Sequence, residues 1–341
     1  MSRSSERTNF IGARPSTDDT CPAAHMNDAC APNQAAIDEV DCLVVGGGPG
    51  GLTAALYLAR FHRDCLVVDA GASRASLIPR TRNYPGFPPG ISGNALLARL
   101  REQAAGYGAR FEQGHVEEIE PHADGFQVRY GDRLCIARRI ILATGIEDTL
   151  PSMPDAQAAI AAGSLRLCAI CDGYEVDGDD IAVYGEAEDT IRHAVFLRTF
   201  TDRVTVVVHG NPSACDEAMA LANHYGIRLI NDAVEALRPC PQGIELVTTR
   251  QGTHHFDIIY PNLGARFRSE LALKLAVACD EDGALIVDGH QQTSVPGVYA
   301  LGDVVVGLKQ MSVAIGHAAQ AATAVHNSLE CRPWGGSQAL R

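Results

Sequence analysis

The stretch DCLVVGGGPGGLTAALYLARF, residues 41–61, decides the fold. Five residues with strand character run into a glycine turn, and an Ala- and Leu-rich helix follows. In this pattern Gly46 allows the tight turn, Gly48 lets the backbone approach a pyrophosphate, and Gly51 lets helix and strand pack closely. We therefore predict a dinucleotide site with the phosphate on the helix N-terminus.

The strand after this helix supplies the other half of the pattern. Residues 65–68 are apolar and end on Asp69. An acid at this position holds a ribose hydroxyl in dinucleotide-binding folds. Strand, turn, helix, strand and acid in this order are far more specific than the glycines alone.

A second informative stretch is Cys168-Ala-Ile-Cys171-Asp172-Gly173. A Cys-x-x-Cys pair holds two sulfurs close enough to cycle between dithiol and disulfide, and a helix that begins there favours the thiolate of the first cysteine. Asp172 is then a candidate proton donor and acceptor. The alternative is half of a four-cysteine zinc site, but no second metal half-site follows at the usual spacing. We predict a redox pair and no metal.

The composition fits a soluble two-domain α/β enzyme. The 341 residues exceed the length at which single cores usually divide, and 46% of them are hydrophobic. The net charge of −13 leaves no basic stripe for nucleic acid. No apolar run approaches the ~20 residues of a membrane span, and the N-terminus lacks the apolar core of a signal peptide. We predict a cytoplasmic protein with neither nucleic acid nor a membrane as a partner.

Eleven cysteines over this length indicate reduced thiols rather than a disulfide framework. Cys42, Cys65 and Cys135 fall in predicted strands, and we expect them to be small buried hydrophobic residues.

Both ends of the chain differ from the middle. Residues 1–38 are polar without periodicity, and we expect a disordered leader. An auxiliary redox pair formed by Cys21 and Cys30 of this leader is the less favoured alternative to a disordered segment. Residues 331–341 form a tail whose role no pattern decides.

The remaining patterns predict further elements in chain order. We expect a helix at 93–107, strands at 114–119, 125–130, 133–136 and 139–142, a second Rossmann-like unit from 181 to 208, a strand at 297–301 and a helix at 311–327. The strand at 139–142 ends in the turn Ala143-Thr144-Gly145, whose small residues can lie close to a cofactor. Pro151 and Pro154 mark a linker.

With these motifs in view, the chain resembles the low-molecular-weight thioredoxin reductase family of flavoproteins over about residues 40–329. The resemblance rests on motifs in a fixed order: Gly46-x-Gly48-x-x-Gly51, Asn83-Tyr84-Pro85-Gly86, Ala143-Thr144-Gly145, Cys168-x-x-Cys171-Asp172-Gly173, Gly302-Asp303 and Lys309-Gln310.

The resemblance implies an α/β fold with two Rossmann-like domains of the three-layer ββα type. An FAD domain is built from residues 39–150 and 276–330, and an NAD(P)H-type domain that carries the cysteine pair, residues 151–275, is inserted between them. It also implies a homodimer, and a rotation of the inserted domain by which the dithiol and the nicotinamide take turns at the flavin.

The resemblance further implies FAD as cofactor and assigns residues to it. The cofactor positions are Gly46, Gly48, Gly51, Asp69, Asn83, Thr144, Gly145, Gly302, Asp303 and Gln310. The first three glycines would hold the pyrophosphate, and Asp69 would hold the ribose. Asn83 and Gln310 would lie at the flavin ring, and Asp303 would bind the ribityl or pyrophosphate region. Taken singly, Asp69, Asn83 and Gln310 also fit ordinary turn or cap chemistry.

Three catalytic residues follow from the same resemblance. Cys171 would exchange electrons with the flavin, and Cys168 would attack the substrate disulfide of thioredoxin or of a small molecule. Asp172 would be the general acid and base, with its pKa raised by burial.

The inserted domain departs from the family pattern. A phosphate-binding turn should read Gly-x-Gly-x-x-Ala, whereas this chain has Gly185-Glu186-Ala187-Glu188-Asp189-Thr190. Ala187 adds a Cβ where backbone must meet pyrophosphate, and the acids repel a phosphate at the helix N-terminus. The same acids would also stabilise the helix dipole without any nucleotide. The basic run that takes the 2′-phosphate of NADPH is replaced by residues 209–212, His-Gly-Asn-Pro. We predict that NADPH is not used efficiently.

Other functions remain open at this stage. Ferredoxin would be the electron donor if Arg192, His193, Arg198 and Arg203 form a basic patch, but a solvated helix face is the favoured interpretation of this cluster. Dithiol oxidases of this family reduce oxygen, but they tend to carry histidine after the second cysteine, so Asp172 favours a reductase. A non-enzyme alternative is a flavin redox sensor or scaffold. Cys171→Ala separates these classes, because an enzyme loses turnover and a scaffold keeps its partners.

Overall fold

The computed structural model describes residues 38–333, and its largest element is a seven-stranded sheet. The strand order is β3-β2-β1-β6-β5-β4, and β16 also pairs with β6. The strands are β1 (Asp38–Val45), β2 (Cys65–Asp69), β3 (Arg110–Gln113), β4 (Val116–His122), β5 (Gly125–Tyr130), β6 (Arg133–Leu142) and β16 (Val298–Ala300). Strand β5 pairs antiparallel with both β4 and β6. The two neighbours of β1, which are β2 and β6, run parallel to it.

Strand β1 lies inside this sheet because it is apolar on both faces. Leu43 and Val44 are fully buried, as a parallel sheet covered on both sides requires. Val45 pairs with Val68 of β2 and with Leu142 of β6. This register brings the ends of three neighbouring strands to one edge of the sheet, which is where open α/β folds bind their ligands.

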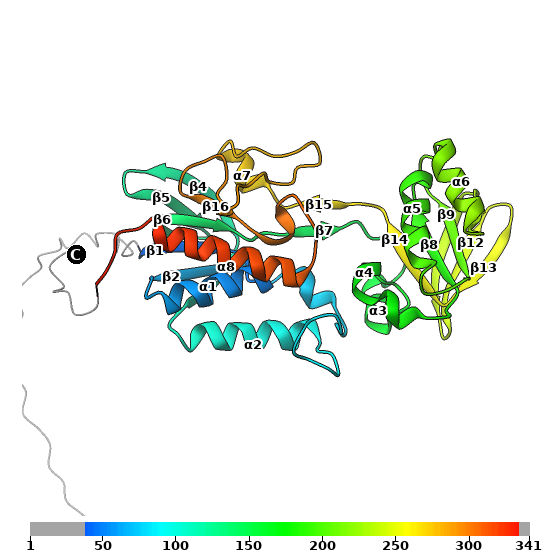
Figure 1. Cartoon of the computed structure of the whole chain (residues 1–341), viewed down its shortest axis with the longest axis horizontal. Helices are drawn as coiled ribbons and strands as arrows, with labels where there is room; N and C mark the ends of the chain where they lie inside the picture. The colour runs from blue at the N-terminus through cyan, green and yellow to red at the C-terminus, as the bar shows by residue number, and fades with distance from the viewer. Residues whose placement is uncertain (1–37, 334–341) are drawn as a thin grey trace, which may run out of the picture. The chain divides into compact units, whose positions relative to one another are not determined.

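Three helices, α1 (Pro49–Arg60), α2 (Gly93–Ala105) and α8 (Met311–Asn327), cover one face of the sheet (Figure 1). The buried residues between α1, α8 and the sheet are mostly small, which allows close packing: Ala54, Ala55, Ala318, Ala321 and Ala322. The other face packs against the chain from α7 (Glu270–Lys274) to Val305.

A second unit contains a smaller parallel sheet in the order β10-β9-β8-β14. Helices α5 and α6 pack on one face of it, and the antiparallel strands β11, β12 and β13 pack on the other. The elements are β8 (Ile181–Gly185), α5 (Ala187–Leu197), β9 (Val204–Val208), α6 (Asp216–His224), β10 (Arg228–Ile230), β11 (Val234–Cys240), β12 (Gly243–Thr248), β13 (Gly252–Phe256) and β14 (Ile258–Asn262).

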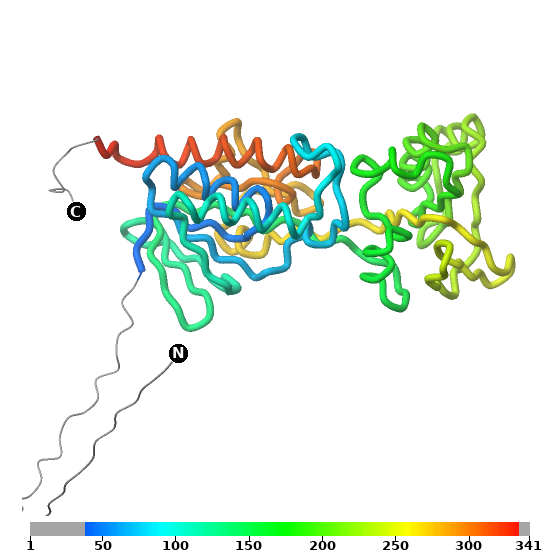
Figure 2. The backbone as a smooth tube through the Cα atoms, turned by 90° about the horizontal axis from the view of Figure 1, so that it is seen from below, coloured from blue at the N-terminus to red at the C-terminus, as the bar shows by residue number. Residues whose placement is uncertain are grey.

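Two paired strands join these units. Strand β7 (Ile146–Asp148) follows the larger sheet in the chain, and β15 (Ala265–Phe267) runs antiparallel beside it on the return, as Figures 1 and 2 show. The short helical elements are η1 (Arg74–Leu77), α3 (Ala156–Ala162), α4 (Ala169–Asp172), η2 (Gly173–Val176) and η3 (Gly302–Val304).

The predicted fold class is confirmed, because one Rossmann-like α/β unit is inserted into the chain of another. The numbered domain boundaries stay a prediction. The helix predicted at 311–327 agrees with α8. The segments 133–136 and 139–142 are strands, as predicted, but their division into two is wrong, because both lie in the continuous strand β6. The arginines inside β6 do not interrupt it, since their guanidinium groups bond to Ser328 and Glu330 near the end of the described chain.

The predictions for the chain ends are not tested. The expected leader, apart from Asp38 at the start of β1, and the tail beyond Pro333 lie outside the described residues, as do Cys21 and Cys30. Within residues 38–333, none of the helices combines the length and the apolar character that a membrane crossing needs.

Cys42, Cys65 and Cys135 are buried, as predicted. Burial raises the pKa of the Cys65 thiol, and likewise that of Cys135, to about 12. These thiols therefore stay protonated and act as packing residues.

The core of the larger sheet supplies a stability test. We expect Ile140→Ala to lower the free energy of unfolding by about 2–5 kcal/mol, because Ile140 is fully buried between β1 and β16 and its truncation leaves a cavity. The matched control is Leu134→Ala on the same strand, where 37% exposure predicts a loss below about 1 kcal/mol. Urea denaturation measures both, and equal losses would contradict the packing described above.

Candidate active site

The candidate site is a cleft of about 870 Å³ at the edge where the strands of the larger sheet end. Ligand pockets commonly measure about 300–1,000 Å³, so this cleft suits a large cofactor. Every cofactor-binding and catalytic residue predicted from the sequence lines it. The cleft therefore brings the glycine turn, the cysteine pair and the residues before α8 together.

The glycine turn has no room for side chains. Gly46 has a φ of +106°, and a Cβ added there would lie 2.5 Å from the carbonyl oxygen of Ala143. A Cβ on Gly51 would lie 2.0 Å from the oxygen of Gly46, so strand and helix touch through backbone. Gly48 precedes α1 with extended backbone, and its own Cβ position is nearly open. The turn is a cradle that fits a pyrophosphate at the start of α1.

Asp69 at the end of β2 reaches back to this turn. Its Oδ1 accepts a hydrogen bond of 3.0 Å from the backbone N–H of Gly71. A Cβ on Gly47 would lie 2.2 Å from Oδ2 of Asp69. The sequence pattern gave no role to Gly47, whose missing side chain makes room for the carboxylate.

The turn after β6 is fixed by the returning chain. The Thr144 hydroxyl donates to the carbonyl oxygen of Arg268 at 2.6 Å, and the Arg268 N–H donates to the oxygen of Gly145 at 3.0 Å. Gly145 has a φ of +71°. This turn, which lines the cleft, is therefore tied to the segment that follows β15.

An arginine that the sequence did not single out also lines the cleft. Arg74 in η1 makes two hydrogen bonds to Asp148, at 2.6 and 2.9 Å. Its Nη1 lies 3.6 Å from a carboxylate oxygen of Asp303, which follows Gly302, a residue with a φ of +76°. Burial raises the pKa of Asp303, and Arg74 opposes this shift. Arg74 thus holds two carboxylates at the cleft.

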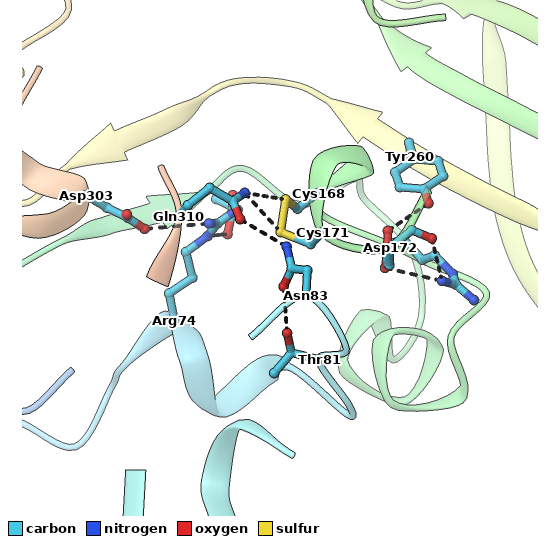
Figure 3. Close-up of a disulfide and its surroundings, with 11 residues drawn as sticks. Arg74, Thr81, Asn83, Cys168, Cys171, Asp172, Tyr260, Asp303 and Gln310 are labelled. Atoms are coloured by element: carbon cyan, nitrogen blue, oxygen red, sulfur yellow. Dashed lines mark hydrogen bonds and ion pairs between the residues drawn. A yellow bond between two sulfur atoms is a disulfide. The ribbon is translucent and has the colours of Figure 1, made fainter. Parts of the chain in front are cut away.

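The cysteine pair forms a disulfide at the start of α4, with Cys168 as its N-terminal flanking residue. The side chain of Gln310, just before α8, donates through Nε2 to both sulfurs, at 3.4 Å for Cys168 and 3.3 Å for Cys171 (Figure 3). Asn83 Nδ2 donates to Gln310 Oε1 at 3.1 Å, and the Thr81 hydroxyl donates to Asn83 Oδ1 at 2.8 Å. A chain of hydrogen bonds through Thr81, Asn83 and Gln310 therefore reaches the disulfide from the larger unit.

Asp172, at the end of α4, has two partners that the sequence did not predict. The Tyr260 hydroxyl donates to Oδ1 at 2.8 Å, and Arg166 Nη1 lies 3.3 Å from Oδ2. Burial raises the pKa of the Asp172 carboxyl, as predicted, while Arg166 and Tyr260 counteract this shift.

A comparison with protein-family models matches residues 40–318 to the family described as pyridine nucleotide-disulphide oxidoreductase. The chain belongs to this family. Together with the thioredoxin reductase relatives below, this match makes the chain an FAD-dependent disulfide oxidoreductase.

Individual relatives agree with this assignment. A thioredoxin reductase of Mycolicibacterium smegmatis is 32% identical over 276 residues, which cover 78% of this chain and 88% of the relative. A bifunctional thioredoxin reductase/thioredoxin of Mycobacterium leprae is 33% identical over 298 residues, which cover 84% of this chain and 62% of the relative. The crystal structure of the Streptococcus pyogenes thioredoxin reductase matches with a TM-score of 0.79 at 27% identity, covering 85% of this chain and 97% of that one. The chain is thioredoxin reductase-like.

The cradle gives a test of the cofactor site in this oxidoreductase. We predict that Gly51→Ala lowers the amount of flavin that copurifies, because the new methyl group meets the rigid oxygen of Gly46. Gly316→Ala in α8 is the matched control, since a Cβ there meets nothing within 4 Å and alanine favours a helix. The ratio of flavin to protein absorbance measures the difference. Full flavin content in Gly51→Ala would contradict the assignment of the turn.

Proposed function

We propose that the protein passes electrons between FAD and the Cys168–Cys171 pair, and between that pair and a disulfide of thioredoxin or of a small molecule, without efficient use of NADPH. The observation that carries the proposal is the contact of Gln310 with both sulfurs inside the cofactor cleft. The bifunctional relative, whose name joins a thioredoxin reductase to a thioredoxin, supports thioredoxin as the substrate class.

The proposed cofactor contacts follow the shape of the cleft. Gly46, Gly48 and Gly51, which line the cleft, would hold the pyrophosphate, and Asp69 would hold the ribose. Asn83 and Gln310 would contact the flavin ring, Thr144 and Gly145 would line the cleft beside it, and Gly302 with Asp303 would bind the ribityl or pyrophosphate region. When bound, FAD would exchange two electrons with the Cys168–Cys171 pair, which lines the same cleft.

The cysteines then act on the substrate in two steps. The Cys168 thiolate attacks one sulfur of the substrate disulfide, and one substrate thiol leaves with a proton. The Cys171 thiolate attacks Cys168 Sγ, releases the second substrate thiol and closes the disulfide present in the structure. Two electrons and two protons reach the substrate, and Asp172 relays the protons.

The N-terminus of α5 argues against tight binding of NADPH. Glu186 flanks the helix, and Glu188 lies in its first turn. The N–H of Ala187 donates to the backbone oxygen of Asn211 at 3.1 Å, and the Glu188 carboxylate accepts from the N–H of Cys215 at 3.3 Å. The loop after β9 therefore uses an amide that a pyrophosphate would need, and the acids add negative charge.

The end of β9 supports the same conclusion. Nδ1 of His209 and the Tyr184 hydroxyl share a hydrogen bond of 2.8 Å. Gly210 and Asn211 follow His209 in the chain. No arginine stands in this run to bind a 2′-phosphate.

Ferredoxin is the less favoured electron donor. Arg192 of the suggested basic patch pairs with Glu188 at 3.2 Å and with Glu217 at 4.0 Å. Arg198 and Arg203 donate to backbone carbonyl oxygens of their own domain. The ion pairs of Arg192 therefore leave less free positive charge on this patch for an acidic partner. We therefore favour a dithiol as the reductant of the Cys168–Cys171 pair, with the dithiol itself oxidised to a disulfide. In the oxidase alternative the reduced pair passes these two electrons to the flavin, and the flavin passes them to oxygen.

We also propose a cytoplasmic homodimer. The resemblance to the thioredoxin reductase family supports the dimer, and reduced thiols such as the exposed Cys215 suit a reducing compartment. Sedimentation of the purified holoprotein tests the dimer, and a monomer at micromolar concentration would contradict it.

The NADPH proposal predicts slow flavin reduction. We expect micromolar NADPH or NADH, added anaerobically, to leave the flavin absorbance band largely intact over minutes, because α5 repels the phosphate. Rapid bleaching by micromolar NADPH would contradict this and would make the protein an ordinary NADPH-dependent reductase.

The substrate proposal predicts a single turnover without any nucleotide. Protein reduced with dithiothreitol and then desalted should reduce oxidised thioredoxin, because the dithiol carries the electrons. Cys168→Ser should lose this reaction. Unchanged thioredoxin oxidation state with the wild-type protein would exclude thioredoxin as the substrate, and hydroxyethyl disulfide would then test the small-molecule alternative.

A further inference from the structure

The carboxylate of Asp172 is held by two donors on the side chain's two oxygens. Tyr260 lies on Oδ1 at 2.8 Å and Arg166 on Oδ2 at 3.3 Å. Figure 3 shows Asp172 pointing toward Tyr260, while the sulfurs of Cys168 and Cys171 face Gln310. Asp172, the proposed proton donor and acceptor, is therefore held by two residues of the inserted domain, Tyr260 and Arg166.

Both donors are themselves held in place. Tyr260 is fully buried in β14, whose backbone pairs with β8, so its hydroxyl has a fixed position. Arg166 donates through Nε to the oxygen of Gly163 at 3.0 Å. Arg166 Nη1 also lies 3.4 Å from the backbone oxygen of Asp172. The donors form a preorganised clamp rather than two mobile surface groups.

The other charged or titratable groups around this carboxyl are few. Glu175 in η2 acts against ionisation of Asp172, but its own charge is opposed by Arg82 at 3.8 Å. The His193 ring of α5 lies 6.0 Å from the Tyr260 ring, and burial lowers the pKa of His193, so this imidazole adds no fixed positive charge near pH 7. Arg166 and Tyr260 are thus the groups that stabilise the carboxylate.

We propose that Tyr260 and Arg166 are positioning residues that keep the Asp172 carboxylate ionised and set the pH at which it takes up a proton. The proposal rests on the proposed relay role of Asp172 and adds the groups that tune it. A phenol hydroxyl and a guanidinium both stabilise a carboxylate through donated hydrogen bonds, whereas burial favours the neutral acid. Loss of either donor therefore makes Asp172 easier to protonate.

The test follows the Asp172 carboxyl itself. Infrared difference spectra of the oxidised holoprotein, recorded across a pH series, identify the Asp172 carbonyl band as the band that Asp172→Asn removes. We expect Tyr260→Phe and Arg166→Gln each to raise the proton affinity of Asp172 about tenfold, the size of a hydrogen bond to a charged group. The midpoint of the band then moves to higher pH. Arg166→Lys, which keeps the charge, should move it less than Arg166→Gln.

A matched control separates tuning from general damage. Tyr184→Phe removes a buried tyrosine hydroxyl from the neighbouring strand β8, where the partner is His209 rather than Asp172. We expect this variant to leave the midpoint unchanged. An unchanged midpoint in both Tyr260→Phe and Arg166→Gln, with circular dichroism showing folded protein, would overturn the proposal, and so would an equal shift in Tyr184→Phe.

A kinetic arm distinguishes this failure from failure of the proposed function. The dithiothreitol-reduced protein is mixed with hydroxyethyl disulfide, whose leaving thiolate needs a proton, across the same pH series. If Asp172→Asn leaves this rate unchanged, Asp172 does not relay protons. That outcome overturns the relay role even if Tyr260→Phe and Arg166→Gln move the infrared midpoint of the Asp172 carboxyl. If Asp172→Asn slows the reaction but Tyr260→Phe and Arg166→Gln keep the wild-type pH profile, the relay stands and the positioning role is overturned.

Discussion

The contact between Gln310 and the disulfide is the interaction on which the account depends. Gln310 precedes α8 of the larger unit, while Cys168 and Cys171 belong to the inserted unit. Asn83 fixes the Gln310 amide, and Thr81 fixes Asn83 in turn. These hydrogen bonds hold the Gln310 amide nitrogen within 3.4 Å of both sulfurs. The disulfide is thereby held at the cleft that the cofactor is proposed to occupy.

The same contact is weak enough to be reversible. Disulfide sulfurs are weak acceptors, so leaving Gln310 costs little compared with unfolding either sheet. The rigid parts lie elsewhere: Leu43 and Val44 anchor the larger sheet, and Val183 and Tyr260 anchor the smaller one. Two stable cores joined by β7 and β15, with a weak polar contact at the cysteine pair, are compatible with the proposal that the cysteines alternate between the cofactor and a substrate disulfide.

Local signals predicted much of this site, and long-range contacts account for the rest. The glycine turn was predictable because Gly46 and Gly51 obey backbone constraints that act within a few residues. Arg74 was not, since its partners Asp148 and Asp303 lie far along the chain and follow no spacing rule. Tyr260 reads as an ordinary core residue of an apolar strand, and only the packing of α4 on β14 reveals its hydroxyl beside Asp172.

The most direct test of the central claim is whether dithiol electrons reach the flavin through the cysteine pair. Anaerobic dithiothreitol is added to the wild-type holoprotein and to the Cys168→Ser/Cys171→Ser variant while the flavin band is followed, with dithionite as the control for reducible flavin. The account predicts bleaching of the wild type by dithiothreitol and of both proteins by dithionite, with the variant unaffected by dithiothreitol. Equal bleaching of the two proteins by dithiothreitol, or a wild-type flavin that stays oxidised while its disulfide is reduced, would contradict the account.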